Sequence, residues 1–290
     1  MRNRLLATTA IALAMGGAAS AADFQEKFEG TKPAVSGFNG KIEFGYINTD
    51  IDSGDDADGA YGVGSFSAPL GDQFGIQVDA GLARLDSAVD VTLAGIAAHG
   101  FWRDPDRGLL GGYAQYSRLS SGGPDANIFR LGAEGEIYLD RVSLEGFAGA
   151  DIVDGSSDNE TYFSGDFTAA FYATDNFRIS GGIGHQFNET FGKVGAEAML
   201  PFASNNVALF ADGNFGSDYQ TYRAGLRIYF GESGKSLLAR HREDDPRTRL
   251  LDFFALGGAF NTPSVGGGSE EGGGSEEGGG GSEEGGGAPT

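Results

Sequence analysis

Charged residues alternate with apolar residues along a series of short segments of this 290-residue chain. In residues 220–230, Arg223 and Arg227 fall on one side of an extended chain, and Leu226 and Ile228 fall on the other. A period of two with different residues on its two faces is typical of a β-strand between two environments. Charged side chains on the inner face of such a sheet could attract, repel or orient polar solutes, or pair with one another.

The alternation predicts an inward-facing set of charged and amide side chains that would line a lumen. We expect Arg178, Arg223 and Arg227 to form a basic strip opposite acidic residues, setting a transverse field across a water-filled pore. The alternative is an interior packed with ion pairs and closed to solutes. The predicted lumen-lining residues are Lys41, Glu43, Gln77, Asp79, Arg130, Glu134, Glu136, Asp166, Arg178, Lys193, Glu197, Asp212, Arg223 and Arg227.

The residue types needed for catalysis are sparse. The chain has no cysteine and three histidines, His99, His185 and His241. His185 precedes Gln186-Phe187-Asn188, which fits no serine–histidine pair for nucleophilic catalysis. No Cys/His metal spacing or phosphate-binding glycine loop is present. We therefore predict that the protein is not an enzyme and has no catalytic residue, metal or cofactor. The formal net charge of −21 argues against nucleic-acid binding, which requires a basic surface.

The first residues have the pattern of an export signal. Arg2 and Arg4 precede a short apolar run, and Ala19-Ser20-Ala21 fits a signal-peptidase cleavage site. The apolar run is too short for a helix to cross roughly 30 Å of hydrocarbon. We predict a cleaved signal peptide over 1–21 and a polar periplasmic segment over 22–36 that leads into the folded part.

From 37 to 230 the chain divides into alternating segments, each about as long as a tilted strand that crosses a bilayer. Connectors after even-numbered segments are short and several after odd-numbered segments are longer, as in barrels with periplasmic turns and extracellular loops. Because backbone groups in hydrocarbon need internal partners, the sheet must close. The predicted fold is all-β, a closed antiparallel up-and-down transmembrane β-barrel of about 12 strands over 37–230. The predicted strands are 38–49, 59–69, 73–85, 89–103, 108–118, 126–139, 142–153, 161–173, 177–187, 190–202, 206–216 and 220–230.

Two details of these strands carry further expectations. Strict alternation places His99 on the apolar side of the fourth strand, which predicts a β-bulge there. Aromatic residues cluster at both ends of the strands, which predicts two girdles at the membrane interfaces. The first girdle would contain Phe74, Phe101, Trp102, Tyr138, Phe171, Phe177, Phe202, Tyr229 and Phe230, and the second Tyr46, Tyr61, Tyr116, Phe187, Phe191 and Tyr219.

The signal, the alternating strands and the final Tyr229-Phe230 together resemble Gram-negative bacterial outer-membrane β-barrels of the porin-like superfamily. The resemblance covers Gly37 to Phe230, although the chain continues for 60 residues where many members end. It implies localisation in the cell outer membrane and contact with membrane lipid and lipopolysaccharide. It also implies that Phe230 serves assembly by the barrel-assembly machinery. The expected function is a porin-like channel for passive diffusion of small hydrophilic solutes through a charged lumen. The alternative is a closed structural or adhesive barrel without transport.

The residues after the last strand form two further predicted segments. Residues 231–265 are expected to be a periplasmic linker with a short helix ending before Pro246, because the residue before a proline disfavours helix. Apolar residues that include Leu250 and Leu251 could dock on the barrel mouth or on a partner, or belong to a lightly ordered linker. Residues 266–290 repeat Gly-Gly-Gly-Ser-Glu-Glu with small variations and are expected to form a disordered tail in the periplasm.

Overall fold

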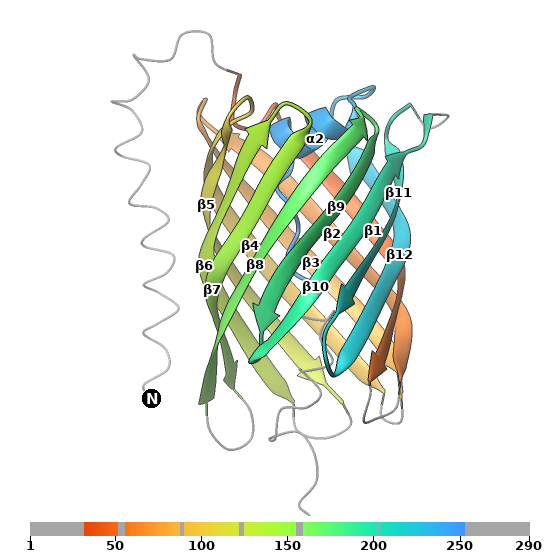
Figure 1. Ribbon diagram of the computed structural model, residues 1–290. Coiled ribbons are helices and arrows are strands. Elements are labelled where there is room, and N and C mark those ends of the chain that lie inside the picture. The colour runs from red at the N-terminus through yellow and green to blue at the C-terminus, as the bar shows by residue number, and fades with distance from the viewer. Residues whose placement is uncertain are drawn as a thin grey trace, which may run out of the picture.

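The computed structural model describes residues 32–51, 56–87, 90–121, 125–154, 159–201 and 204–252. The predicted signal peptide and the predicted Gly/Ser/Glu-rich tail lie outside these residues. The described chain forms a closed barrel of twelve strands, followed by one short helix, α2, over Leu237–Glu243 (Figure 1). The strands are β1 (Asn39–Ile51), β2 (Ala57–Leu70), β3 (Phe74–Asp86), β4 (Val91–Asp104), β5 (Gly108–Ser120), β6 (Ala126–Leu139), β7 (Val142–Asp154), β8 (Asn159–Thr174), β9 (Phe177–Gln186), β10 (Glu189–Met199), β11 (Val207–Phe215) and β12 (Tyr219–Phe230).

The predicted fold is confirmed in strand number, order and closure. Each strand pairs antiparallel with its neighbours in sequence, and β1 pairs with β12 from Gly40↔Phe230 to Ile51↔Tyr219. We call the end that carries the β2–β3, β4–β5, β6–β7, β8–β9 and β10–β11 connections the turn rim, and the opposite end the loop rim. The described residues contain no helix long and apolar enough to span a membrane.

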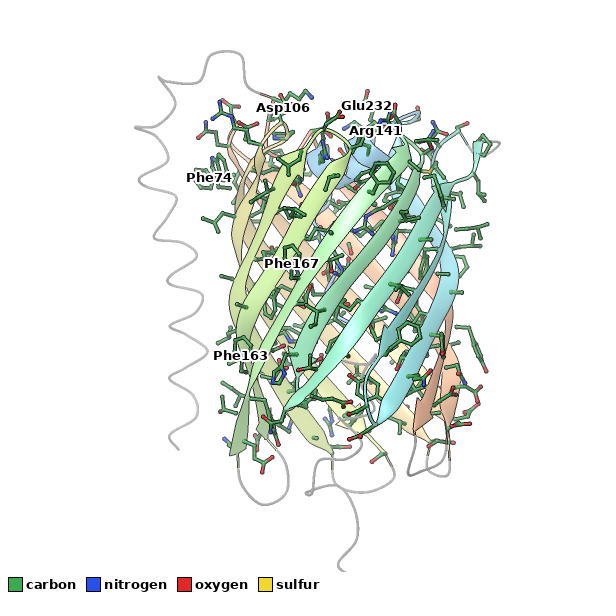
Figure 2. All side chains as sticks on the ribbon, viewed as in Figure 1. Phe74, Asp106, Arg141, Phe163, Phe167 and Glu232 are labelled. Atoms are coloured by element: carbon green, nitrogen blue, oxygen red, sulfur yellow. The ribbon has the colours of Figure 1, made fainter. Side chains whose placement is uncertain are left out.

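The outer wall between the rims is apolar. Phe163 and Phe167 are 60% and 49% exposed on the outside, and Phe74 lies there closer to the turn rim (Figure 2). The polar residues Asp106 and Arg141 lie at the turn rim instead. Water-exposed surfaces rarely carry so continuous an apolar belt, which is the surface that a lipid bilayer requires. The outward-facing large apolar residues include Ile42, Phe44, Ile76, Val78, Leu82, Ile96, Leu131, Ile137, Ile183, Val194 and Leu209.

The inner face differs from the prediction in the half nearest the loop rim. An apolar cluster fills this region on the β1–β7 side, with members that include Ile47, Leu85, Leu93, Ile128 and Val153. Alternation detects a contrast between two faces, so it underestimates apolar residues that face inward among charged ones. This part of the lumen is therefore packed like a protein core.

The prediction that His99 lies on the outward, apolar side of β4 is wrong, because His99 faces inward. The predicted bulge is also absent from β4. β4 pairs with β3 in unbroken register from Phe74↔Trp102 to Leu85↔Val91. His99 lies on the inner face together with the buried apolar residues Val91 and Leu93. The register shift recorded in the barrel lies between β8 and β9, around Tyr172 and Thr174.

The two predicted girdles are wrong for the aromatic residues whose positions face inward. These residues are Tyr61, Phe101, Tyr138, Phe191, Tyr219 and Tyr229, and all are buried. Three of the tyrosines donate hydrogen bonds to inward carboxylates: Tyr229 to Glu197 at 2.6 Å, Tyr138 to Glu136 at 2.7 Å, and Tyr61 to Glu43 at 2.9 Å. A tyrosine suits a buried site when its hydroxyl finds a partner. Phe202 lies outside the described residues.

The seam between β1 and β12 depends on glycine. A Cβ atom on Gly225 would lie 2.2 Å from the backbone oxygen of Phe44, whereas a Cβ on Gly64 in β2 would have no neighbour within 4 Å. We expect Gly225→Ala to destabilise closure by about 1–3 kcal/mol, the usual effect of overpacking. The matched variant Gly64→Ala should fold like wild type. The folded fraction after refolding in detergent micelles, read from heat-dependent gel mobility, checks this; equal folded fractions for the two variants would contradict it.

Candidate functional site

The lumen contains the chain's own C-terminal segment. After β12 the chain reverses at Gly231, whose φ of +109° favours glycine. It then forms α2, whose N-cap Ser236 accepts a hydrogen bond from the backbone N–H of Ala239. Residues 244–252, here called the luminal segment, continue inside the barrel. The sequence predicted a periplasmic linker with a short helix; the helix is present, and residues 231–252 contact the turn rim and the lumen.

α2 closes the turn rim through Arg240, which is almost fully buried. Its guanidinium donates hydrogen bonds to the backbone oxygens of Asn205 and Glu232, each at 3.0 Å, and to Asn206 Oδ1 at 2.8 Å. It also lies 5.1 Å from the centre of the Tyr229 ring, within cation–π range. One side chain thus ties α2 to the β10–β11 connection and to the end of the barrel.

His241 and Arg242 hold the same helix against three tyrosines at the turn rim, Tyr138, Tyr172 and Tyr229. His241 Nδ1 lies 2.9 Å from the hydroxyl of Tyr172, and its Nε2 lies 3.2 Å from that of Tyr229. Burial lowers the pKa of His241 to about 3, and the nearby Arg178 and Arg227 add to this lowering against the opposite effect of Glu197. Arg242 lies 5.0 Å from the Tyr138 ring. At neutral pH, α2 therefore docks with a neutral imidazole.

The segment before β1, together with Arg103 of β4, holds the C-terminal end of α2 in place. The backbone N–H of Ser36 donates to the oxygen of Glu243 at 2.8 Å, and Ser36 Oγ donates to Asp244 Oδ1 at 2.5 Å. Arg103 is buried and donates to the backbone oxygens of Ala34 and Asp244 at 3.3 and 3.2 Å. Both ends of the barrel sequence thus meet beneath the helix.

Beyond α2, the luminal segment follows the inner face of β1–β5. Lys41 Nζ donates to the backbone oxygen of Pro246 at 2.9 Å. Ser67 Oγ donates to Asp245 Oδ1 at 2.5 Å, and Ser65 Oγ lies 2.9 Å from Thr248 Oγ1. Burial raises the pKa of Asp245, against the opposite effects of Lys41 and of the hydrogen bond from Ser67. These contacts show a segment fitted to the wall.

Leu250 fills a space that two glycines leave open. Gly81 and Gly95 are partners in the β3–β4 register, and a Cβ on them would approach the Leu250 methyl groups to 2.9 and 3.0 Å. Gln115 Nε2 donates to the backbone oxygen of Leu250 at 3.2 Å. Leu250 and Leu251 belong to the apolar cluster near the loop rim. The segment is therefore anchored by apolar packing as well as by polar contacts.

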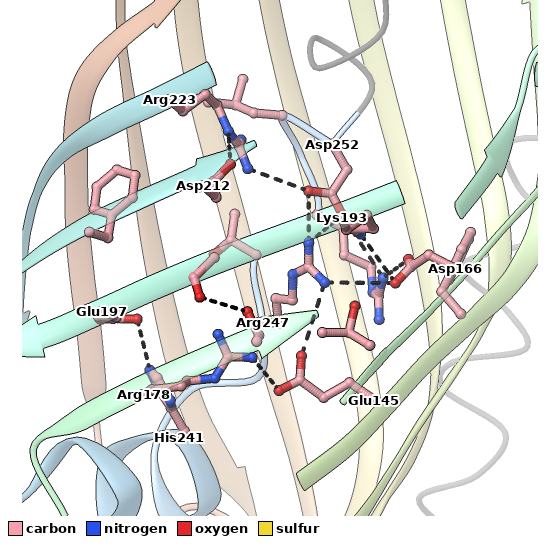
Figure 3. A pocket seen from close by; sticks show the side chains of 18 of the residues that line it. Glu145, Asp166, Arg178, Lys193, Glu197, Asp212, Arg223, His241, Arg247 and Asp252 are labelled. Atoms are coloured by element: carbon pink, nitrogen blue, oxygen red, sulfur yellow. Dashed lines mark hydrogen bonds and ion pairs between the residues drawn. The ribbon is translucent and has the colours of Figure 1, made fainter. Parts of the chain in front are cut away.

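On the other side, the luminal segment presents charge to β6–β12. Arg249 Nη1 lies 2.5 Å from Asp166 Oδ2, and Arg249 Nε lies 3.5 Å from Glu134 Oε2. Arg247 pairs with Asp252 at 3.1 Å and lies 3.7 Å from Asp166, which Lys193 also contacts at 3.4 Å (Figure 3). Burial alone would raise the pKa of Asp252, but Arg247 and Lys193 hold it below its usual range.

Arg178, Arg223 and Arg227 do not form the predicted basic strip, because each of them is paired directly with carboxylates. Arg178 pairs with Glu145 at 2.6 Å, and Arg223 pairs with Asp212 at 2.7 Å. Arg227 binds Glu43 and Glu197 together. Each arginine thus neutralises carboxylates on nearby strands, because buried charges are stable only when paired. The field across the lumen is broken into local pairs.

The structure places the fourteen predicted lumen residues on the inner wall. Besides the pairs above, Arg130 forms a bidentate ion pair with Asp151 at 2.6 and 3.0 Å, and Gln77 donates to Asp79 Oδ1 at 2.9 Å. Phe230 ends β12 at the turn rim and is half-exposed on the outside; its role in assembly stays a prediction.

Sequence reasoning missed His99 and the arginines of the C-terminal segment. His99 Nδ1 lies 2.8 Å from Glu134 and its Nε2 lies 3.1 Å from Asp79, so it joins two predicted lumen carboxylates. One signal was available for the segment: in a chain of net charge −21, Arg240, Arg242, Arg247 and Arg249 fall within ten residues. Such a concentration of cations suits an acidic receiving surface.

A cavity of about 140 Å³ remains between the luminal segment and the wall of β6–β12. Its lining includes Arg178, Lys193, Asp212, Arg223 and Asp252 (Figure 3). It has room for on the order of ten water molecules. The described residues contain no cluster of three or more His, Cys, Asp or Glu side chains that could hold a metal. The cavity can therefore hold water beside the paired charged side chains that line it.

No protein-family model and no curated protein matches the sequence. Among solved structures, the barrel is similar to an outer-membrane channel from Pseudomonas putida F1, with a TM-score of 0.54, 11% identity and coverage of 70% of this chain and 99% of that one. It also matches the translocator domain of the autotransporter NalP from Neisseria meningitidis, with a TM-score of 0.47, 15% identity and coverage of 78% and 98%. The KdgM porin matches with a TM-score of 0.46, 12% identity and coverage of 66% and 99%. With its lipid-facing apolar belt, the chain has the fold of a twelve-stranded bacterial outer-membrane β-barrel.

Proposed function

We propose that the protein is an outer-membrane channel for small hydrophilic solutes that its own luminal segment holds closed. The observation that carries this proposal is the ion-paired boundary between Arg247, Arg249 and the wall of β6–β12, with a cavity beside it. Ion pairs beside a polar cavity can exchange partners with water and ions, whereas an apolar core cannot. A polar boundary therefore suits a segment that leaves its site.

Removal of the luminal segment should open the pore and make it prefer cations. Glu134, Glu145 and Asp166 lose Arg247 and Arg249, whereas Lys193 and Arg223 lose Asp252, so the wall loses two positive partners and one negative partner. Rings of carboxylates favour cations in channels. In planar bilayers we expect the full chain to remain closed most of the time and a chain truncated after Gly231 to show discrete, cation-selective conductance steps.

Folding of the truncated chain is verified first by heat-dependent gel mobility, so that a lack of conductance is not confused with misfolding. Equal conductance of the full and truncated chains would show that the segment does not close the pore. A folded truncated barrel without conductance would reject the channel. It would favour the second candidate, a closed structural barrel, for which the apolar cluster near the loop rim is the supporting observation.

A further inference from the structure

The wall of β1–β5 binds the luminal segment through its backbone. Lys41 Nζ donates to the backbone oxygen of Pro246 at 2.9 Å, and Gln115 Nε2 donates to that of Leu250 at 3.2 Å. In peptide-binding sites, main-chain hydrogen bonds give affinity and pockets for the side chains give specificity. These two donors recognise the peptide group and not a particular side chain, so this wall can bind an extended peptide in general.

Consecutive side chains of the segment contact different walls. Thr248 and Leu250 contact β2–β4. Arg247 and Arg249 lie against carboxylates of β6–β8. An extended chain produces this alternation, because its successive side chains point to opposite faces. The lumen therefore offers an extended peptide two surfaces, one of them acidic.

The position that Arg249 occupies suits a guanidinium group. Arg249 Nε lies 3.5 Å from Glu134 Oε2, and Arg249 Nη1 lies 2.5 Å from Asp166 Oδ2. The remaining nitrogen, Nη2, donates to the backbone oxygen of Gly146 at 3.4 Å. Three acceptors thus surround one planar fork, a geometry that fits arginine better than the compact ammonium group of lysine.

The position that Arg247 occupies has acceptors that the segment does not use. Arg247 Nη1 lies 4.0 Å from Glu145 Oε2, which is beyond hydrogen-bond distance (Figure 3). Glu145 Oε2 and the hydroxyl of Thr168, the register partner of Glu145, are buried and have no hydrogen-bond partner among the described residues. Both side chains line the cavity. Buried polar groups normally have partners, so this wall can accept more hydrogen bonds than the segment donates.

The segment's own Asp252 holds Arg247 away from these acceptors. Arg247 Nη2 donates to the two carboxylate oxygens of Asp252 at 3.2 and 3.1 Å. The backbone N–H of Asp252 donates to the oxygen of Arg249 at 3.0 Å, which closes a turn that fixes this pairing. The segment is therefore an incomplete ligand for the wall that holds it.

We propose that the inner wall is a binding site for extended peptides with arginine at alternate positions, and that the luminal segment is its resident occupant. The inference rests on the proposed function, because a peptide reaches this site only when the segment leaves it, and it names arginine-bearing peptides as the solutes. A free peptide can place a guanidinium group closer to Glu145 and Thr168 than the tethered Arg247 does. It thus competes with the segment for the same carboxylates.

Fluorescence anisotropy with a dye-labelled peptide tests this site. The host is the full chain carrying Arg249→Glu in detergent micelles; heat-dependent gel mobility checks its folding, and trypsin cleavage after Arg247 checks release of its segment. The probe is the amide-capped peptide Asp-Asp-Pro-Arg-Thr-Arg-Leu-Leu-Asp, which has the sequence of residues 244–252. The control peptide has glutamate in place of the second arginine. We expect the host to bind the probe at least tenfold more tightly than the control peptide. The wild-type chain should bind the probe at least tenfold more weakly than the host, because its own segment competes.

Two further substitutions in this host locate the bound peptide. Asp166→Asn removes a carboxylate that both arginines approach and should weaken binding of the probe at least tenfold. Asp125→Asn removes a carboxylate from an exposed pair at the loop rim and should change it less than threefold. Equal affinity for the two peptides, or for the two variants, would overturn the proposal. A segment that stays protected from trypsin in Arg249→Glu would overturn it as well, because the wall would then not select arginine. A barrel that conducts after truncation but binds no peptide would overturn this inference and leave the channel proposal intact.

Discussion

Arg249→Glu is expected to release the luminal segment while leaving the barrel folded. Arg249 is buried between Asp166 and Glu134 and lies 5.1 Å from the Phe147 ring. The substitution removes a buried partner of two carboxylates and adds a third negative charge. Breaking a buried ion pair costs roughly 3–5 kcal/mol, which lowers the ratio of docked to undocked segment by about two to four orders of magnitude.

Trypsin reports this release, because cleavage after Arg247 requires the segment to leave the lumen. Native-state cleavage follows the population of the open form when closing is fast. We expect the rate of cleavage after Arg247 to rise at least 100-fold in Arg249→Glu. Arg249→Met, which keeps a side chain of similar length without charge, should give an intermediate rate. Arg118→Glu, at an exposed pair with Asp125, should leave the rate unchanged. Protection of Arg249→Glu equal to wild type would contradict the buried bridge.

Leu250→Ala is expected to produce the second large effect, through loss of apolar packing. Leu250 is almost fully buried against the Gly81–Gly95 pair. Truncating a buried leucine to alanine costs about 2–5 kcal/mol, depending on how far the site collapses. Cleavage after Arg247 should therefore accelerate by roughly 30-fold or more. The barrel itself should keep its heat-dependent mobility, because Leu250 lies outside its strands.

A double-mutant cycle with Gly81→Ala separates this packing from a general loosening. In the wild-type background a Cβ on Gly81 meets Leu250 at 2.9 Å and Val63 at 3.0 Å, so the single substitution should weaken docking. In Leu250→Ala the first clash disappears and the new methyl group fills part of the hole. We expect favourable coupling of roughly 0.5–3 kcal/mol. Strict additivity of the two substitutions would show that Leu250 does not lie on this glycine.

The barrel was predictable because its cause is local and repeated. Each strand alternates apolar residues on its outer face with polar residues on its inner face. Strands such as Phe129–Leu139 or Val207–Phe215 can therefore be recognised from their own sequence, without knowledge of the neighbouring strands. The same parity assigned Glu43, Glu197 and Arg227 to the lumen, where the structure joins them in one cluster. It could not give the pairing, because register depends on how the strands align across the sheet.

The occupied lumen was not predictable because its cause is complementarity between distant parts of the chain. Residues 244–252 form neither a helix nor a strand, so no periodicity identifies them. Their fit depends on Ser65, Ser67 and the Gly81–Gly95 pair, which are ordinary strand residues when considered alone. His99 was misplaced for a related reason, since its inward neighbours Val91 and Leu93 are apolar and make the inner face of β4 look like the outer one.

A disulfide between Cys residues at positions 65 and 248 tests the occupied lumen most directly. Ser65 Oγ and Thr248 Oγ1 are 2.9 Å apart, and the chain has no cysteine to interfere. In Ser65→Cys/Thr248→Cys we expect mild oxidation of the folded, full-length protein to give nearly complete cross-linking, reversed by reductant. Thr49→Cys/Thr248→Cys is the control, because Thr49 lies near the loop rim, far along β1 from Lys41, the partner of Ser65. Two free, maleimide-reactive thiols in the folded Ser65→Cys/Thr248→Cys protein would contradict a segment inside the barrel.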